Sequence, residues 1–115
     1  MGILVLLFGA FAATAVLLAG FSRLLPAGFL AAAVTARSNH SGPARQIGGL
    51  AAAPVAILVV AIAASAGMAD SGFAVGAIVG AALLAVVGFV DDRRDLGAGA
   101  KLAGQFAGAI LLVLS

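Results

Sequence analysis

Long apolar stretches separated by short polar ones set the pattern of this chain. Three of them, residues 2–22, 50–67 and 73–90, carry no charge. Each is long enough to cross a hydrocarbon layer of about 30 Å as a helix. A fourth, residues 102–115, gives only about 21 Å of helix at about 1.5 Å per residue. The pattern predicts an all-α, multi-pass transmembrane helix bundle over residues 1–115, with three full spans and the start of a fourth.

The composition supports a membrane protein. Of 115 residues, 64% are hydrophobic and 9% are charged, and the mean hydropathy is +1.29; a soluble domain carries about a quarter charged residues. The chain has no cysteine, which excludes disulfides, zinc–thiolate sites and a thiol nucleophile. Its net charge of +2 comes from only six basic and four acidic side chains. Because this excess is so small, we predict no nucleic-acid partner.

The connections carry their own signals. Residues 24–36 are apolar but too short to span, and they contain Pro26, which favours an interfacial or re-entrant piece. Asp70 or Ser71 is placed to cap the third span. Within that span, the GxxxG spacing of Gly76 and Gly80 favours the close approach of another helix.

Basic residues predict the topology. They flank or occupy the first and third connections and are missing from the second: Arg23, Arg37, Arg45, Arg93, Arg94 and Lys101. Because cytoplasmic loops carry the excess of Lys and Arg, we expect residues 37–49 and 91–101 in the cytoplasm and the N-terminus outside.

The acidic residues gather in one block. Residues 88–97 contain Asp91, Asp92 and Asp95, three of the four acidic residues of the chain. A carboxylate at the centre of a spanning helix costs roughly 2.5–3.5 kcal/mol, and less near its ends. The end of the third span is also the negative end of its helix dipole, where adjacent carboxylates repel each other. We therefore expect a positive partner, either Arg93 and Arg94 or a divalent metal that carries a phosphate; the alternative is a solvated loop with ordinary ion pairs.

Four further polar residues are candidates for the same membrane face. His40 lies in a polar loop, where a solvated side chain is the plainer interpretation. Arg45 is explained equally well as a topology anchor. Lys101 stands near the start of the fourth helix, an unfavourable position that an aspartate or a phosphate would relieve. Gln105, one turn later, would hydrogen-bond a neighbouring helix or a substrate.

Two blocks of this sequence resemble a known membrane family. One is Arg37-Ser38-Asn39-His40-Ser41-Gly42-Pro43 running into Gly48-Gly49-Leu50-Ala51, and the other is Gly88-Phe89-Val90-Asp91-Asp92-Arg93-Arg94-Asp95-Leu96 followed by Lys101-Leu102 and Gln105. They are similar to the first cytoplasmic loop and the aspartate-rich block of the polyprenyl-phosphate N-acetylhexosamine-1-phosphate transferases, relatives of the phospho-N-acetylmuramoyl-pentapeptide transferase. The resemblance covers essentially the whole chain but only the N-terminal part of a typical member, so we expect a fragment that is inactive alone.

The resemblance implies a reaction and its parts. A sugar-1-phosphate passes from a UDP-N-acetylhexosamine to undecaprenyl (polyprenyl) phosphate, UMP leaves, and Mg²⁺ is required, on the cytoplasmic face of a bacterial inner membrane in cell-envelope synthesis. By position, Asp91 and Asp92 match the catalytic aspartates of the family, and Asp92 is also expected to be a metal ligand. Substrate-binding positions are His40, Gly48, Gly49 and Lys101, with Asp95, Arg45 and Gln105 as lesser candidates. The sequence departs from the family at residues 45–47, which weakens the case for Arg45. A homodimer is left open.

Two other classes remain open. An intramembrane prenyltransferase also uses an aspartate-rich Mg²⁺–diphosphate site, although it would lack the loop from His40 to Gly49. In a non-enzymatic helical subunit, the aspartates would form a structural ion-pair cluster. Downstream sequence would separate these classes, since further spans with another aspartate-containing loop favour the transferase.

Overall fold

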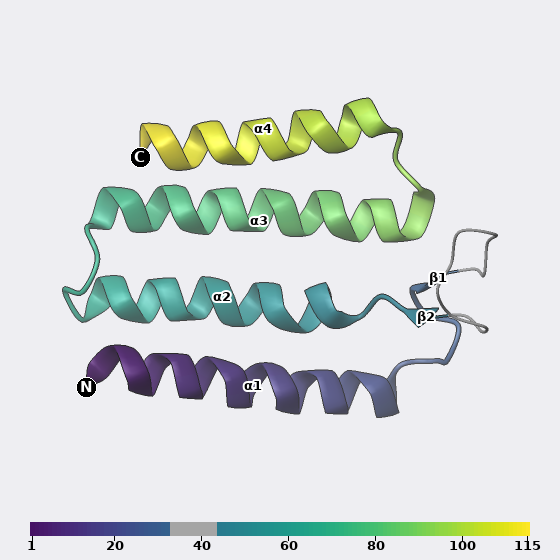
Figure 1. Ribbon diagram of the computed structural model, residues 1–115, viewed down its shortest axis with the longest axis horizontal. Coiled ribbons are helices and arrows are strands. Elements are labelled where there is room, and N and C mark those ends of the chain that lie inside the picture. Colours follow the sequence, from purple (N-terminus) through teal and green to yellow (C-terminus); the bar gives the residue numbers. More distant parts are fainter. Residues whose placement is uncertain (33–43) are drawn as a thin grey trace.

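Four antiparallel α-helices lie side by side in the order of the sequence (Figure 1). The structure, a computed structural model, describes residues 1–32 and 44–115. Its elements, in chain order, are α1 (Gly2–Leu24), β1 (Ala31–Ala32), β2 (Ala44–Arg45), α2 (Gly48–Ser65), α3 (Ser71–Arg94) and α4 (Ala98–Leu114).

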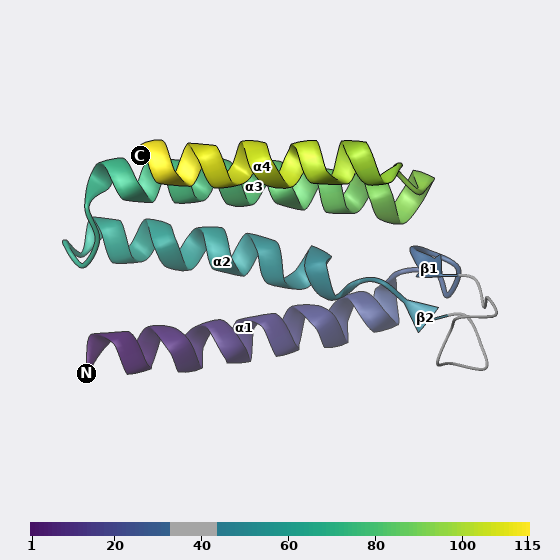
Figure 2. The ribbon, with the colours of Figure 1, turned by 45° about the horizontal axis from the view of Figure 1, so that its top comes forward.

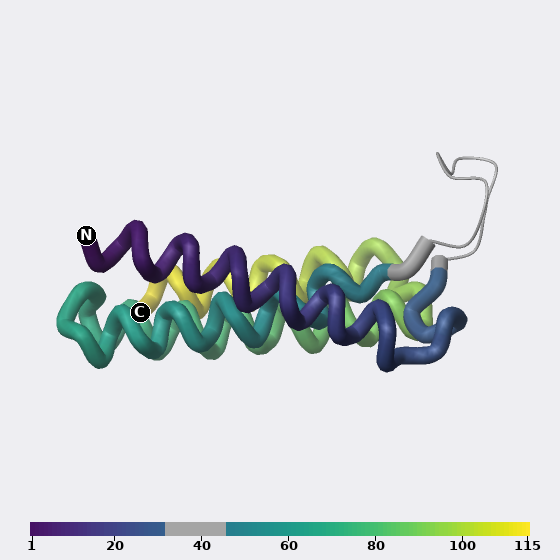
Figure 3. Tube along the Cα trace, turned by 90° about the horizontal axis from the view of Figure 1, so that it is seen from below, coloured from purple at the N-terminus to yellow at the C-terminus, as the bar shows by residue number. Residues whose placement is uncertain are grey.

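The helices form a slab that measures 47 × 33 × 21 Å. The extensive contacts are those of α1 with α2, α2 with α3, and α3 with α4. A view turned by 45° shows α4 in front of α3, so the slab is not flat (Figure 2). From below, α1 runs across the front of the row (Figure 3).

Three of the helices are long and apolar enough to cross a membrane: α1, α2 and α3. The fourth, α4, is shorter. Large apolar side chains such as Leu4, Phe8 and Phe11 are exposed along α1, as expected for a helix that faces lipid rather than water. The structure thus confirms the predicted all-helical, multi-pass membrane fold.

The helix ends differ from the predicted span limits. α2 begins two residues before the predicted position 50, α3 continues four residues beyond the predicted position 90, and α4 begins four residues before position 102. α3 ends where Asp95 takes a left-handed conformation (φ 40°), with its N–H donating to the Asp91 carbonyl at 2.8 Å. Because a helix satisfies its own backbone groups whatever the polarity of its side chains, the apolar stretch was a poor guide to its end. The predicted loop over residues 91–101 is therefore wrong in extent, and only residues 95–97 link the two helices.

Glycines allow α3 and α4 to pack closely. A Cβ atom placed on Gly80 would lie 3.1 Å from the carbonyl oxygen of Gly108, and one on Gly104 would lie 2.8 Å from Cγ2 of Val87. Gly76 faces the backbone of α4 in the same way. The predicted GxxxG contact is confirmed, and its partner is α4: Gly80 meets the backbone of Gly108, and Gly76 meets Leu111 and Ser115.

The structure also shows the helix cap and the turns in the connections between the helices. Oδ2 of Asp70 accepts hydrogen bonds from the N–H groups of Gly72 (2.9 Å) and Phe73 (3.2 Å), so the predicted cap of α3 is confirmed. Residues 25–30 form turns that lead into β1, which pairs with β2 in the antiparallel register Ala31–Arg45. This segment lies at the end of the slab (Figure 1). Of the predicted interfacial or re-entrant piece, residues 24–36, positions 33–36 lie outside the described residues.

Candidate functional site

The acidic block and the described part of the first connection lie at the same end of the slab (Figure 1). The last turn of α3, the link 95–97 and the first turn of α4 meet there, beside β1, β2 and the start of α2. The predicted gathering of Asp91, Asp92, Asp95 and Lys101 at one end of the bundle is confirmed, and the backbone of Arg45 in β2 lies at the same end. Gly48 and Gly49, at the start of α2, lie there too. His40 lies outside the described residues.

Lys101 is the positive partner of two aspartates. Its Nζ atom lies 3.0 Å from Oδ1 of Asp91 and 3.6 Å from Oδ1 of Asp95. The same Oδ1 of Asp91 accepts a hydrogen bond from the Leu96 N–H at 2.8 Å. A cation at a helix N-terminus is repelled by the positive end of the helix dipole. In the ion-pair cluster of Asp91, Asp95 and Lys101, the two carboxylates offset this repulsion.

The ion pair also shifts the titration of the lysine. The hydrogen bond to the Asp91 carboxylate raises the pKa of Lys101 above its ordinary value of 10.5, and Asp95 adds a smaller effect in the same direction. Lys101 is therefore a permanent cation at neutral pH. Its side chain is 39% exposed, which leaves the ammonium open to an anion from solution.

Asp92 faces a different neighbourhood from Asp91. Successive residues of a helix are separated by about 100° around its axis, so the two carboxylates diverge. Asp92 lines a groove between α2 and α3 with a cavity volume of about 1160 Å³. Of the adjacent aspartates, one is therefore tied to α4 and the other opens toward α2.

The groove between α2 and α3 is apolar along most of its length and polar at one end. Its walls are formed mainly by alanine, leucine, isoleucine and valine side chains of the two helices. Its polar groups are Gln46 and Asp92, which lie at the end where α2 begins and α3 ends. Gly49 lines the same end. Such a groove suits a long apolar ligand with a polar head.

The aspartates do not form a complete metal site by themselves. Among residues 1–32 and 44–115, no three acidic or histidine side chains gather as metal ligands. Asp91 and Asp95 both pair with Lys101, whereas Asp92 is the acidic residue that lines the groove. It fits a Mg²⁺ ion as a single ligand, consistent with the way Mg²⁺ is held by one or two carboxylates together with phosphate oxygens and water.

The remaining predicted residues have mixed outcomes. Gly48 and Gly49 lie in the first turn of α2, and only Gly49 reaches the groove. The backbone of Arg45 belongs to β2. Gln105 is exposed on α4, and no hydrogen bond joins it to a neighbouring helix within the described ranges.

Arg93 makes aromatic contacts that were not expected from the sequence. The guanidinium carbon of Arg93 lies 5.2 Å from the ring centroid of Phe89 and 5.5 Å from that of Phe29. Phe89 precedes Arg93 by four residues, a spacing that brings two side chains together on one helix face and could have been noticed. Phe29 comes from a distant segment, and no local pattern predicts its position.

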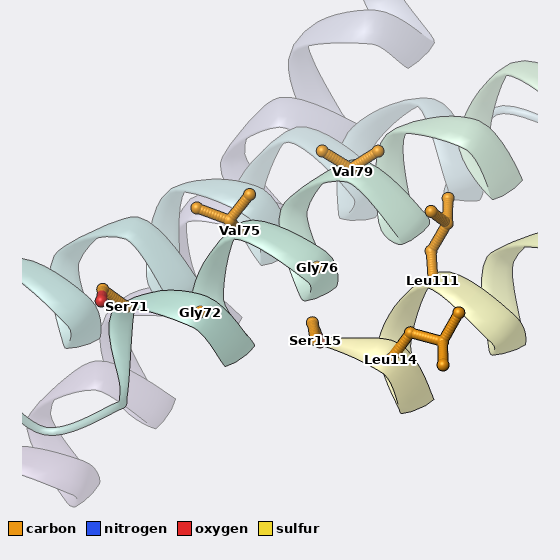
Figure 4. Close-up of a pocket in the computed structure, with 8 residues that line it drawn as sticks. All are labelled: Ser71, Gly72, Val75, Gly76, Val79, Leu111, Leu114 and Ser115. Atoms are coloured by element: carbon orange, nitrogen blue, oxygen red, sulfur yellow. The ribbon is translucent and has the colours of Figure 1, made fainter.

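A second cavity lies at the opposite end of α3 and α4. Figure 4 shows Ser71 and Gly76 of α3 facing Leu111 and Ser115 at the end of α4. Its volume is about 530 Å³, and no charged side chain lines it. None of the predicted site residues belongs to this cavity, so the candidate site is the groove end with Asp92 together with the adjacent ion-pair cluster.

No protein-family model, curated protein or solved structure matches this chain. The features of the structure that bear on function are therefore the groove, its acidic end and the neighbouring cation.

Proposed function

We propose that the chain contributes to a membrane phosphotransferase that moves a sugar-1-phosphate from a UDP-N-acetylhexosamine to a polyprenyl phosphate. The observation that carries the proposal is the groove between α2 and α3, which is apolar along most of its length and has Asp92 among the lining residues of its polar end. The groove would hold the lipid chain, and its polar end would hold the lipid phosphate. The proposed setting is a bacterial inner membrane, with this end of the slab in the cytoplasm.

The chemistry needs charge neutralisation and positioning. An oxygen of the lipid phosphate forms a new bond to the phosphorus attached to the sugar, and the bond from that phosphorus to the UMP oxygen breaks. Mg²⁺, held by Asp92 and the phosphates, would neutralise the charge that develops on their oxygens. Lys101 places a cation beside the same helix end, where phosphoryl groups of the donor are stabilised by positive charge.

The proposal is tested on the product of the complete gene in native membranes. Release of UMP from a UDP-N-acetylhexosamine, dependent on polyprenyl phosphate and Mg²⁺, is the expected activity. Asp92→Asn should lower it by roughly 10²–10⁴-fold, the range typical of a lost acid–base or charge-organising group.

Asp70→Asn is the matched control. Asp70 caps α3 at the other end of the slab, and Asn caps a helix as well as Asp, so activity should be unchanged. Absence of UMP release by the unaltered protein, or full activity of Asp92→Asn, would contradict the proposal.

One observation favours a second, non-enzymatic function. Asp91 is already engaged by Lys101 and by the Leu96 N–H, as expected of a purely structural tie between α3 and α4. In a helical subunit of a larger membrane complex, Asp91 would matter for folding and Asp92 would be dispensable. The comparison of Asp91→Asn and Asp92→Asn separates the two functions.

A further inference from the structure

Arg93 joins two parts of the chain that are far apart in sequence. Its guanidinium lies between the ring of Phe89, one turn earlier in α3, and the ring of Phe29, in the turn after α1. A planar guanidinium stacks on aromatic faces and is more weakly hydrated than an ammonium. The two contacts therefore fasten the segment after α1 to the end of α3.

The residue next to Phe29 has an unusual backbone. Leu30 has φ 51°, in the left-handed region that a bulky side chain rarely adopts. Its side chain is 7% exposed, and its carbonyl oxygen accepts the Gln46 N–H at 2.8 Å. A strained conformation persists when the surrounding contacts hold it in place, and here these contacts come from both sides of Leu30.

These features meet at the polar end of the groove. Leu30, Gln46, Phe89 and Asp92 all line it. Phe89 thus forms part of the groove wall and also part of the support for Arg93. Leu30 and Asp92 both line this end of the groove. Phe29, the residue before Leu30, is the one that Arg93 of α3 contacts.

We propose that Arg93 is a positioning residue that clamps Phe29 and thereby holds Leu30 as the end wall of the groove next to Asp92. Without the clamp, Leu30 is free to leave the left-handed region, and the polar end of the groove opens to water. A lipid as the occupant of the groove depends on the proposed function, whereas the clamp does not depend on it.

Thiol labelling tests the clamp without any turnover. The chain has no cysteine, so Ala53→Cys, on the groove wall in α2, is its single thiol. In permeabilised membrane vesicles its labelling by a water-soluble maleimide should be slow, because a thiol in apolar surroundings ionises poorly. Arg93→Gln should speed this labelling about fivefold, the factor expected for losing one or two exposed cation–π contacts.

The matched control is Arg94→Gln, which removes the same charge from the next residue, for which the described contacts include no aromatic ring. Its labelling should equal that of the Ala53→Cys background. A second reporter thiol, Ser71→Cys at the opposite end, should label equally in every variant and so exclude general unfolding. Equal labelling of the Arg93→Gln and Arg94→Gln variants at position 53 would overturn the proposal.

Variants of the aromatic and wall residues complete the test. Phe29→Leu should speed labelling as Arg93→Gln does, and Phe29→Trp should not, since tryptophan retains the cation–π contact. Leu30→Gly tolerates the left-handed backbone but removes the wall; adding Arg93→Gln to it should give no further increase, because the two changes act on one element. An additive increase would show that Arg93 does not act through Leu30.

If the protein turns over UDP-sugar, Arg93→Gln should raise the KM for the lipid acceptor and leave the KM for the nucleotide sugar unchanged. A loss of kcat alone would contradict a positioning function. Because the labelling result does not depend on activity, failure of the transferase proposal and failure of the clamp give different outcomes.

Discussion

The Nζ atom of Lys101 lies 3.0 Å from Oδ1 of Asp91, so the start of α4 is tied to the last turn of α3. Asp92, the next residue, lines the groove on the other side of α3. The two aspartates are adjacent in sequence but have different surroundings. Substitutions should therefore separate their contributions to stability and to activity.

The first prediction concerns stability. Asp91→Asn should lower the melting temperature of the purified protein by a few degrees, because it removes the charge that pairs with Lys101 and weakens the bond to Leu96. Lys101→Gln should have a similar effect, and the double variant should be less destabilised than the sum of the two. Asp92→Asn should leave the melting temperature unchanged. Equal destabilisation by Asp91→Asn and Asp92→Asn would argue against the division described here.

The second prediction concerns the contact between α3 and α4. Gly80→Val places a branched side chain against the backbone of Gly108 and should cost about 1–3 kcal/mol, as overpacking typically does. Gly9→Val is the matched control, since a Cβ atom at Gly9 meets nothing within 4 Å. Thermal unfolding of both variants measures the difference. A Gly80→Val protein as stable as Gly9→Val would mean that the two helices are not in close contact.

The third prediction concerns orientation. Ser71, the first residue of α3, and Gly97, just before α4, are both exposed and lie at opposite ends of the slab. Single cysteines at these positions should react with an impermeant maleimide from opposite sides of sealed vesicles. The distribution of basic residues predicts the cytoplasmic side for Gly97. Labelling of both from one side would contradict the topology.

The fourth prediction concerns pH. Because the folded-state pKa of Lys101 is raised, its pairing contributes stability that is fully present below the ordinary pKa of 10.5 and is lost as the pH rises through the folded-state value. The difference in melting temperature between the unaltered protein and Lys101→Gln should be constant between about pH 6 and pH 9 and should shrink only in stronger alkali. A difference that vanishes near neutral pH would show that the ammonium is not held by the aspartates.

The sequence predicted features that depend on composition over many residues or on strictly local chemistry. Apolar length was enough to identify the spans, and an aspartate before an apolar helix was enough to identify the Asp70 cap. The glycine spacing in α3 predicted a close contact, although not which helix would make it. The position of Lys101 at a helix start predicted an aspartate or a phosphate beside it, and Asp91 is that partner. The positive partner expected for the aspartates was Arg93 and Arg94 or a metal, whereas in the structure Lys101 pairs with Asp91 and Asp95.

Other features depend on tertiary placement. The separate directions of Asp91 and Asp92 follow from the continuation of α3 to Arg94, which an apolar pattern cannot indicate because polar residues extend a helix equally well. The conformation of Leu30 and the contact of Arg93 with Phe29 arise from a segment that folds back after α1. No periodicity in the sequence marks that return.

The row-like order of the helices has a consequence for biosynthesis. Each extensive interface joins helices that follow one another in the chain, so every new helix leaving the ribosome finds its main partner already in the membrane. The connections from α2 to α3 and from α3 to α4 are short, and pairing between helices distant in sequence, the slow step in many folds, is not required. We therefore expect α1 to α4 to assemble one hairpin at a time, with the tie between Asp91 and Lys101 forming once α4 has joined α3.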